Sequence, residues 1–356
     1  MTHHTVRAAP YTHSMFTVSR TMIAVMTCLF PATAFGIVLF GWPALFLFAV
    51  TVVTAVLVEA LCLYLTGRAV LHFATDGSAF LTGWLVAMTL PPWAPWWVGA
   101  LGAAIAIILG KHVFGGLGQN LFNPAMVARA VLLVALPVQM TTWVAPVGVS
   151  ETPGFVEALD ITFGGYIPPD AISGATILSE VQSILHSENG MDPSVLSAEV
   201  LRTQFFGRVS GSLGETSAVL LGLGGLGLIL LRIITVSVPL AVMGTVAVLS
   251  AIAHVLDPAH YPPPLFHIAT GSVVFCAFFI ATDYVTAPMT ALGKTLYGMG
   301  IGALIFVIRT WGAFPEGVAF AVLLMNACVP LIDKYTRPRV FGRTRAGDPL
   351  PLEDRP

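Results

Sequence analysis

Two long apolar runs near the amino terminus decide the fold class. Residues 21–40 read TMIAVMTCLFPATAFGIVLF, and residues 43–65 read PALFLFAVTVVTAVLVEALCLYL. A stretch of about 20 apolar residues is long enough to cross the hydrocarbon core of a bilayer as an α-helix. The first run follows a polar segment, residues 1–20, and is too long for the apolar core of a signal peptide. We therefore interpret it as a membrane span that the mature chain retains.

The composition of the whole chain agrees with these two runs. Of its 356 residues 56% are hydrophobic and only 10% are charged, and the mean hydropathy is +0.86, whereas a soluble domain carries about 25% charged residues. This composition excludes a water-soluble protein, so we expect membrane lipid and no nucleic acid among its partners. The cysteines lie far apart in apolar segments without C-x-x-C spacing, which predicts no metal site. They are Cys28, Cys62, Cys276 and Cys328.

Further apolar segments along the chain bring the number of candidate spans to ten. They cover residues 21–40, 43–65, 79–91, 96–110, 123–138, 216–231, 236–256, 267–282, 294–310 and 314–333. Several are short, and the third ends at Pro91-Pro92. Short or broken helices in a membrane have to be buried within protein, and they often mark binding sites.

The two halves of the chain resemble each other. Gly102–Lys111 (GAAIAIILGK) aligns with Gly300–Arg309 (GIGALIFVIR), and an apolar span follows each segment. Five spans in each half force opposite orientations, which predicts an all-α integral membrane protein of about ten transmembrane helices in two inverted five-helix repeats. The alternative is that two segments rich in Gly, Ala and Ile match by composition alone.

The distribution of basic residues predicts the orientation. With the amino terminus in the cytoplasm, only Arg202, Arg208 and Arg309 of the 16 basic residues fall on the outer side. Both termini are then cytoplasmic. The predicted divisions are a cytoplasmic segment 1–20, a first membrane half 21–138, a periplasmic loop 139–215, a second membrane half 216–333 and a basic cytoplasmic tail 334–356.

Three polar motifs can cap a helix or satisfy backbone groups, and the last two of them can instead hold a ligand. In Asp170–Thr176 (DAISGAT), Ser173 or Thr176 can cap a helix over 177–185, and spacing alone favours this role. Gly211–Ser217 (GSLGETS) stands before the sixth span, where its hydroxyls can cap that helix or its free N–H groups can hold a phosphate or a polar flavin edge. Asn120 and Asn123 can hold a polar ligand or satisfy backbone groups.

Two acids and one glycine motif complete the inventory. Glu59 lies within the second span, and Asp283 follows the eighth. Acids inside a membrane are candidates for an ion path, although solvation at a helix end also accounts for Asp283. Gly222–Gly227 (GLGGLG) contains the letters of a dinucleotide fingerprint but follows no strand, so we expect these glycines to permit close helix packing instead.

Five blocks in this order resemble one known family. They are Asn120–Leu133 (NLFNPAMVARAVLL), Ser173–Thr176 (SGAT), Gly211–Ser217 (GSLGETS), Ala281–Pro288 (ATDYVTAP) and Pro315–Asp333 (PEGVAFAVLLMNACVPLID). With them the chain resembles the RnfD/NqrB family, whose members are D subunits of Rnf-type ion-translocating ferredoxin:NAD oxidoreductases and, more distantly, B subunits of sodium-translocating NADH:quinone reductases. The similarity runs essentially from end to end.

This resemblance implies a covalent flavin. In the family, the threonine that ends the D-x-x-[ST]-G-A-T pattern carries FMN through a phosphoester, which a flavin transferase makes outside the cytoplasm. That threonine corresponds to Thr176, and the motif residues are Asp170, Ser173, Gly174 and Ala175. Further flavin contacts are expected at Gly214, Glu215 and Thr216. A second, noncovalent riboflavin is expected near Asn120 and Asn123.

The resemblance also implies partners. We expect a complex in the bacterial inner membrane with subunits of the Rnf A, B, C, E and G types, in which electrons pass between ferredoxin and NAD, coupled to Na⁺ or H⁺ movement. Since no soluble NAD or ferredoxin domain is visible here, those sites are expected on partner subunits, and no catalytic residue is assigned to this chain. Two rivals stay open. One is an inverted-repeat channel or secondary transporter without a redox role. The other is a quinone-reducing subunit of a sodium-pumping NADH dehydrogenase, a branch associated with a long N-terminal extension.

Overall fold

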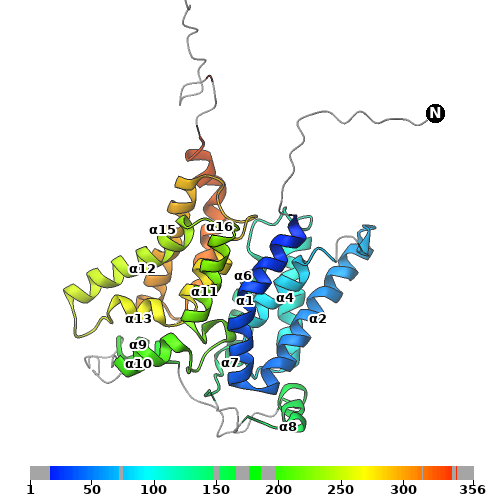
Figure 1. The fold of residues 1–356 in the computed structure, drawn as a ribbon, viewed down its shortest axis with the longest axis horizontal. Helices are drawn as coiled ribbons and strands as arrows, with labels where there is room; N and C mark the ends of the chain where they lie inside the picture. Colours follow the sequence, from blue (N-terminus) through cyan, green and yellow to red (C-terminus); the bar gives the residue numbers. More distant parts are fainter. Residues whose placement is uncertain are drawn as a thin grey trace, which may run out of the picture.

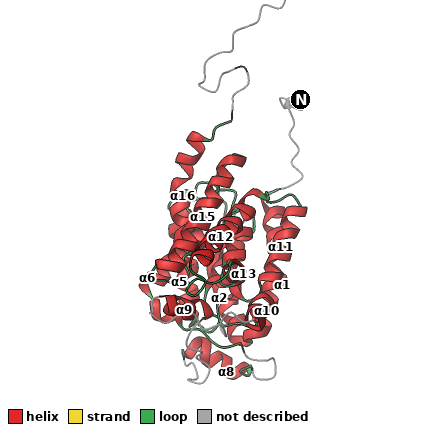
Figure 2. Ribbon diagram, turned by 90° about the vertical axis from the view of Figure 1, so that its left-hand side faces the viewer, coloured by secondary structure: helices red, strands yellow, loops and turns green. Residues whose placement is uncertain are grey.

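The structure is a computed structural model, and it describes residues 17–71, 75–146, 152–165, 176–185, 198–314, 316–338 and 342. Within these ranges the regular elements are all helices, and Figure 2 contains no strand. Six helices are long and apolar enough to cross a membrane. They are α1 (Val18–Phe40), α2 (Trp42–Leu65), Trp96–Phe114, α12 (Ser237–Leu256), α15 (Ala291–Trp311) and α16 (Val318–Tyr335). The prediction of an all-α, multi-pass membrane protein is confirmed.

Three shorter apolar helices lie at predicted spans, and only the first two of these spans were expected to be short. They are α4 (Ser78–Thr89), α6 (Pro124–Ala135) and α11 (Ala218–Leu230). The span Trp96–Phe114 begins as α5 (Trp96–Ile107) and continues as the π-helix η1 (Ile108–His112). Predicted span 123–138 is interrupted, because Pro137 cannot continue α6 and instead begins α7 (Pro137–Thr141).

The expected single span at 267–282 is wrong in detail. The chain forms α13 (Pro264–Ala269), breaks at Thr270-Gly271, and resumes as α14 (Val273–Phe275) and the π-helix η6 (Cys276–Ile280). Gly271 has a φ of +65°, a left-handed conformation that other residues rarely adopt. The break leaves backbone carbonyls and N–H groups free in the interior, and polar side chains have to satisfy them.

Helix packing follows the two halves. In the first half α2 packs against α4 and α5, and in the second half α12 packs against α13, η6 and α15. Between the halves, α1 contacts α11 and α6 contacts α16. Each of these contacts joins helices that hold the same place in the two predicted repeats.

The two ends of the helix bundle differ. In Figure 1, α1 begins and α16 ends at the upper end, whereas α8 (Phe155–Leu159), α9 (Ile177–Leu185) and α10 (Ala198–Phe206) lie at the lower end. We use "upper end" and "lower end" in this sense below. The described parts of the predicted loop 139–215 therefore lie away from the end at which α1 begins.

Candidate functional site

Four charged side chains are buried together between the repeats, in a group that we call the lower charge cluster. Arg129 comes from α6, Glu215 from the short 3₁₀ helix η5 (Leu213–Glu215), Arg309 from the end of α15, and Glu316 from the turn before α16. Their side chains are between 1% and 12% exposed. Buried charges are expensive unless they are paired, so such a group points to a functional or structural role.

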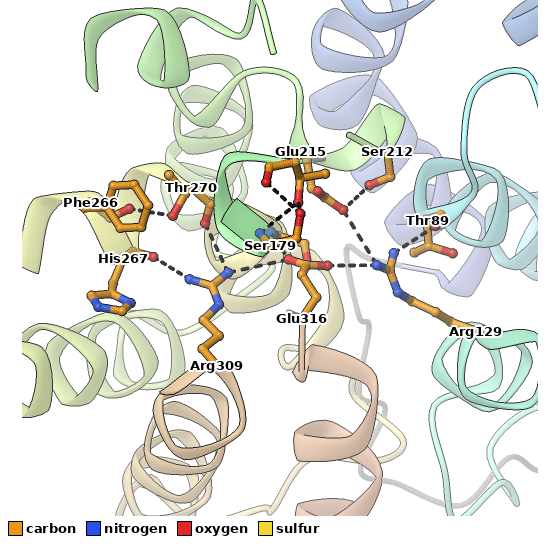
Figure 3. Close-up of polar contacts among 12 residues, drawn as sticks. Thr89, Arg129, Ser179, Ser212, Glu215, Phe266, His267, Thr270, Arg309 and Glu316 are labelled. Atoms are coloured by element: carbon orange, nitrogen blue, oxygen red, sulfur yellow. Dashed lines mark hydrogen bonds and ion pairs between the residues drawn. The ribbon is translucent and has the colours of Figure 1, made fainter. Parts of the chain in front are cut away.

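Glu316 is the centre of this cluster. Arg129 Nη2 lies 2.8 Å from Glu316 Oε2 and 3.6 Å from Glu215 Oε1. Arg309 Nη2 lies 3.5 Å from Glu316 Oε1. Figure 3 shows the two arginines approaching Glu316 from opposite sides. One carboxylate thus joins a helix of the first repeat to a helix of the second.

The same arginines satisfy the backbone at broken helix ends. Arg129 Nη1 donates to the carbonyl of Thr89 at 2.8 Å, where α4 ends. Arg309 Nη1 donates to the carbonyl of His267 at 2.8 Å, and its Nη2 donates to that of Thr270 at 3.1 Å, where α13 ends. The carbonyl end of a helix carries partial negative charge, which these cations neutralise.

The two carboxylates have different proton affinities, and both lie outside the spanning helices. Burial raises the pKa of Glu215 to about 7, with a further contribution from Glu316, against the opposing effects of Arg129 and of the Ser212 hydroxyl, which donates to Glu215 at 2.5 Å. Burial alone would also raise the pKa of Glu316, but Arg129, Arg309 and two hydrogen bonds from Ser272 outweigh it and lower that pKa. Glu215 is therefore the group of the pair that can exchange a proton near neutral pH.

Thr176 caps helix α9 and lies beside the lower charge cluster. Its Oγ1 accepts the backbone N–H of Ser179 at 3.2 Å, as the capping interpretation predicts. Thr176 also lines a cavity of about 50 Å³ together with Arg129, Glu215 and Glu316. The sequence assigned Thr176 and Glu215 to two separate motifs, and the structure brings both residues to one cavity. Asp170, Ser173, Gly174 and Ala175 lie outside the described residues.

The rest of the Gly211–Ser217 segment has a packing role. Gly214 packs so closely that a Cβ there would lie 2.9 Å from the carbonyl oxygen of Met88. The Thr216 hydroxyl donates to the Leu213 carbonyl at 2.9 Å, and Ser217 Oγ caps α11. Neither Gly214 nor Thr216 lines the cavity beside Thr176.

A second small cavity, of about 70 Å³, contains the other predicted ligand residues. Asn120, Asn123 and Asp283 line it together, although the sequence assigned Asp283 to a different role. Asn123 Oδ1 also caps α6 by accepting from the N–H groups of Ala125 and Met126. Asp283 accepts from Val285 N–H and Thr286 Oγ1, each at 3.2 Å.

Comparison with known proteins assigns the family. The model of the NQR2, RnfD, RnfE family matches residues 5–342 of the chain. The chain belongs to this family. Three relatives are each named as the D subunit of an ion-translocating oxidoreductase complex. The one from Rhodobacter capsulatus is 57% identical over 86% of this chain and 85% of its own length. That from Stutzerimonas stutzeri is 50% identical over 94% of each chain, and that from Halorhodospira halophila is 48% identical over 96% and 97%.

Several polar residues of this family member were not expected from its sequence. Arg129 was counted with the basic residues on the side of the termini, and the structure instead buries its guanidinium in the lower charge cluster. Glu59 was expected, but its partners Lys111 and His112 were not. A basic residue within an apolar span is the signal that identifies such groups. Among the described residues no group of His, Cys, Asp and Glu is arranged to hold a metal ion.

Proposed function

We propose that the chain is the D subunit of an ion-translocating oxidoreductase complex of the bacterial inner membrane and carries FMN as a phosphoester on Thr176. The observation that carries the proposal is the position of the Thr176 hydroxyl, at the start of a nine-residue helix and on one cavity with Arg129 and Glu215. The names of the relatives support the complex. The SGAT motif supports the cofactor.

The surroundings of Thr176 fit a phosphoester. A phosphate there would sit at the amino end of α9, where free N–H groups and the helix dipole favour negative charge. When Glu215 is protonated, the lower charge cluster has two arginines against one carboxylate, and its net positive charge complements the single negative charge of a phosphodiester. The cavity that Thr176 lines also contains the Arg129 and Glu316 side chains, so a phosphate on Thr176 would lie beside the lower charge cluster.

The residues of this chain would then position and tune the flavin, which itself supplies the electron-transfer chemistry. Arg129 and the amino end of α9 would hold the phosphate, and Glu215 could release or take up one proton as the charge nearby changes. Electrons would reach this chain from partners of the A, B, C, E and G types, which would hold the NAD and ferredoxin sites. A flavin transferase would attach the FMN on the periplasmic side, and both termini would be cytoplasmic.

The fit of a second flavin is incomplete. The amides of Asn120 and Asn123 and the Asp283 carboxylate could pair with the polar edge of a noncovalent riboflavin, but a cavity of about 70 Å³ is too small for the ring. We assign no step to a second flavin. For the ion path we propose Glu59 and Asp283, because intramembrane acids are costly unless they are used.

A second candidate function is an inverted-repeat channel or transporter without a redox role. The internal two-fold pairing of α1 with α11 and of α6 with α16 favours it, since such repeats are typical of transporters. Flavin content separates the two proposals.

The test is in-gel flavin fluorescence of the denatured chain, made in cells that also make the flavin transferase. Thr176→Ala should abolish the fluorescence because the attachment oxygen is lost, and Thr176→Ser should keep part of it. The matched control is Ser179→Ala, which perturbs the cap of α9 and leaves the nucleophile in place. If the Thr176→Ala chain fluoresces like the parent, the site assignment fails and the transporter function becomes the better proposal.

A further inference from the structure

A second buried ionic group, which we call the upper charge cluster, lies between α2, α4 and η1. Lys111 Nζ donates to Glu59 Oε1 at 2.9 Å and to Ser78 Oγ at 2.8 Å. The side chains of Lys111 and Glu59 are only 2% and 3% exposed. Asp76 Oδ1 accepts from the Ser78 hydroxyl at 2.6 Å. The Lys111 ammonium therefore has oxygen ligands of the kind that hard cations prefer.

This cluster forms the wall of the roomiest of the four cavities described for the molecule. Glu59, Asp76 and His112 line a cavity of about 490 Å³, together with Arg68 and with Thr17, just before α1 begins. The cavity therefore faces the upper end, on the opposite side of the bundle from Thr176. Polar side chains and this volume make it a space that water can fill.

One oxygen of the Glu59 carboxylate faces the imidazole of His112 instead of the Lys111 ammonium. Glu59 Oε2 lies 3.0 Å from His112 Nε2, yet neither atom completes a hydrogen bond with any described residue. A buried carboxylate oxygen without a donor is costly. Here it lies next to an imidazole that lines the cavity, in a position to accept an ion that enters from there.

The two charge clusters hold corresponding places in the two repeats. Gly77-Ser78 begins α4 with a φ of +84° at the glycine, and Gly271-Ser272 precedes α14 with a φ of +65°. Ser78 Oγ accepts from Lys111, and Ser272 Oγ donates to Glu316, which pairs with Arg309. In the sequence alignment of the repeats, Lys111 and Arg309 are equivalent. The clusters are thus related features at opposite ends of the bundle.

The chemistry of the two bases differs. Arg309 is held by two backbone carbonyls as well as by Glu316, and a guanidinium does not lose its proton in proteins. Lys111 holds no backbone carbonyl within the described residues, and an ammonium, unlike a guanidinium, can transfer a proton to a neighbouring carboxylate. Of the two clusters, the upper one is built to exchange its positive charge.

We infer that the upper charge cluster is an exchange site for a monovalent cation, Na⁺ or a proton, in which Glu59 binds the ion and Lys111 is the internal cation that it replaces. The inference rests on the proposed ion-translocating function and names a site for it. Charge balances because the entering ion brings one positive charge as the Lys111 ammonium passes one proton to the Glu59 carboxylate, which lines the cavity and releases that proton to water there, so that Lys111 is left as a neutral amine. The other titratable or charged groups facing the pair are Cys62, Arg68, Asp76 and His112.

The test uses the whole complex, purified and reconstituted into liposomes, with electron transfer, ²²Na⁺ uptake and internal pH followed together. Lys111→Met and Lys111→Arg should each lower ion uptake per electron by roughly tenfold or more, because neither side chain can give up a proton at this position. Covalent flavin fluorescence should stay at the parental level in both. The matched control is Lys334→Met, which removes an exposed lysine at the same end of the bundle.

Lys111→Arg decides between exchange and a structural ion pair. The guanidinium keeps the charge and can still pair with Glu59, so a structural role predicts that ion uptake stays at the parental level. Exchange predicts loss of uptake, because the guanidinium cannot release a proton. Loss of ²²Na⁺ uptake with normal proton uptake identifies Na⁺ as the ion, and the reverse identifies the proton. Parental uptake of both ions in Lys111→Arg would overturn the inference while leaving the flavin proposal intact. Absence of flavin from the parent chain would instead be a failure of the proposed function.

Discussion

Single residues in this protein carry two roles at once. Arg129 neutralises the carbonyl end of α4, and it also forms an ion pair with Glu316 in the wall of the cavity beside Thr176. Thr176 caps α9 with the same oxygen that a phosphoester would use. The cap and the attachment are compatible, because phosphate oxygens can accept from the same free N–H groups.

At this scale Glu215 gives a prediction about pH. Its folded pKa, about 7, lies above its ordinary value of 4.5, so the folded state binds more protons than the unfolded state between these limits. The contribution of Glu215 to stability is therefore fully present below pH 4.5 and is lost as the pH rises to about 7, by up to about 3 kcal/mol. Glu215→Gln cannot ionise and should flatten this part of the profile.

The measurement is the thermal unfolding midpoint of the detergent-solubilised chain from pH 5 to pH 8. Glu157→Gln, at an exposed position of α8, is the control and should keep the parental slope. A Glu215→Gln variant with the parental slope would show that Glu215 does not titrate in this range.

At the scale of elements, broken helices create the polar interior. The interruptions after α4 and α13 leave carbonyl groups that Arg129 and Arg309 satisfy, and the amino end of α14 supplies the Ser272 N–H to Glu316 at 2.6 Å. Continuous helices would have satisfied these backbone groups internally. The breaks thus determine where charged side chains can be buried.

Glycines in α11 give a prediction for helix packing. A Cβ on Gly224 would lie 2.2 Å from the Cys28 carbonyl oxygen of α1, whereas a Cβ on Gly222 would meet nothing within 4 Å. Gly224→Ala should force α1 and α11 apart and cost roughly 1–3 kcal/mol. Gly222→Ala should be neutral or stabilising by up to about 1 kcal/mol, through helix propensity alone. Thermal unfolding of the two variants compares them, and equal midpoints would contradict the packing role of the motif.

At the scale of the molecule, two charge clusters stand at opposite ends of one bundle. Tyr297 is buried in the apolar core of this bundle, and its hydroxyl lies 3.0 Å from the side-chain amide of Asn326. The structure has cavities at both charge clusters, and the apolar core separates the cavities. The proposed flavin site and the proposed cation site therefore lie at opposite ends of the bundle.

The orientation of the bundle gives the prediction at this scale. Asp160 is in η2 (Asp160–Gly164) at the lower end, and α16 ends at the upper end. Alkaline phosphatase fused after Asp160 should therefore be active, as expected in the periplasm, and the same enzyme fused after Arg339 should be inactive. Equal activities would mean that an even number of spans separates the two fusion points. The interrupted segment 267–282 would then be the first candidate for a segment that does not cross the membrane.

The sequence by itself determined the features that depend on local pattern. Hydropathy located the apolar helices, although it missed the break in 267–282, the bias of basic residues predicted an orientation, and short motifs gave capping as one interpretation for Thr176, Asn123 and Ser217. These are properties of neighbouring residues, so they can be recognised without knowing which helices meet.

Only the tertiary structure decided which charges pair. Arg129 meets Glu316 across 187 positions of the chain, and Lys111 meets Glu59 across 52. The helices that bring them together pack through Leu, Val, Ile and Ala side chains that are nearly interchangeable from one helix to another, so no local pattern identifies the partners. The ends of α4 and α13 also determine which backbone carbonyls are free to accept hydrogen bonds from the two guanidinium groups. The position of these helix ends relative to Arg129 and Arg309 depends on the packing of the whole bundle.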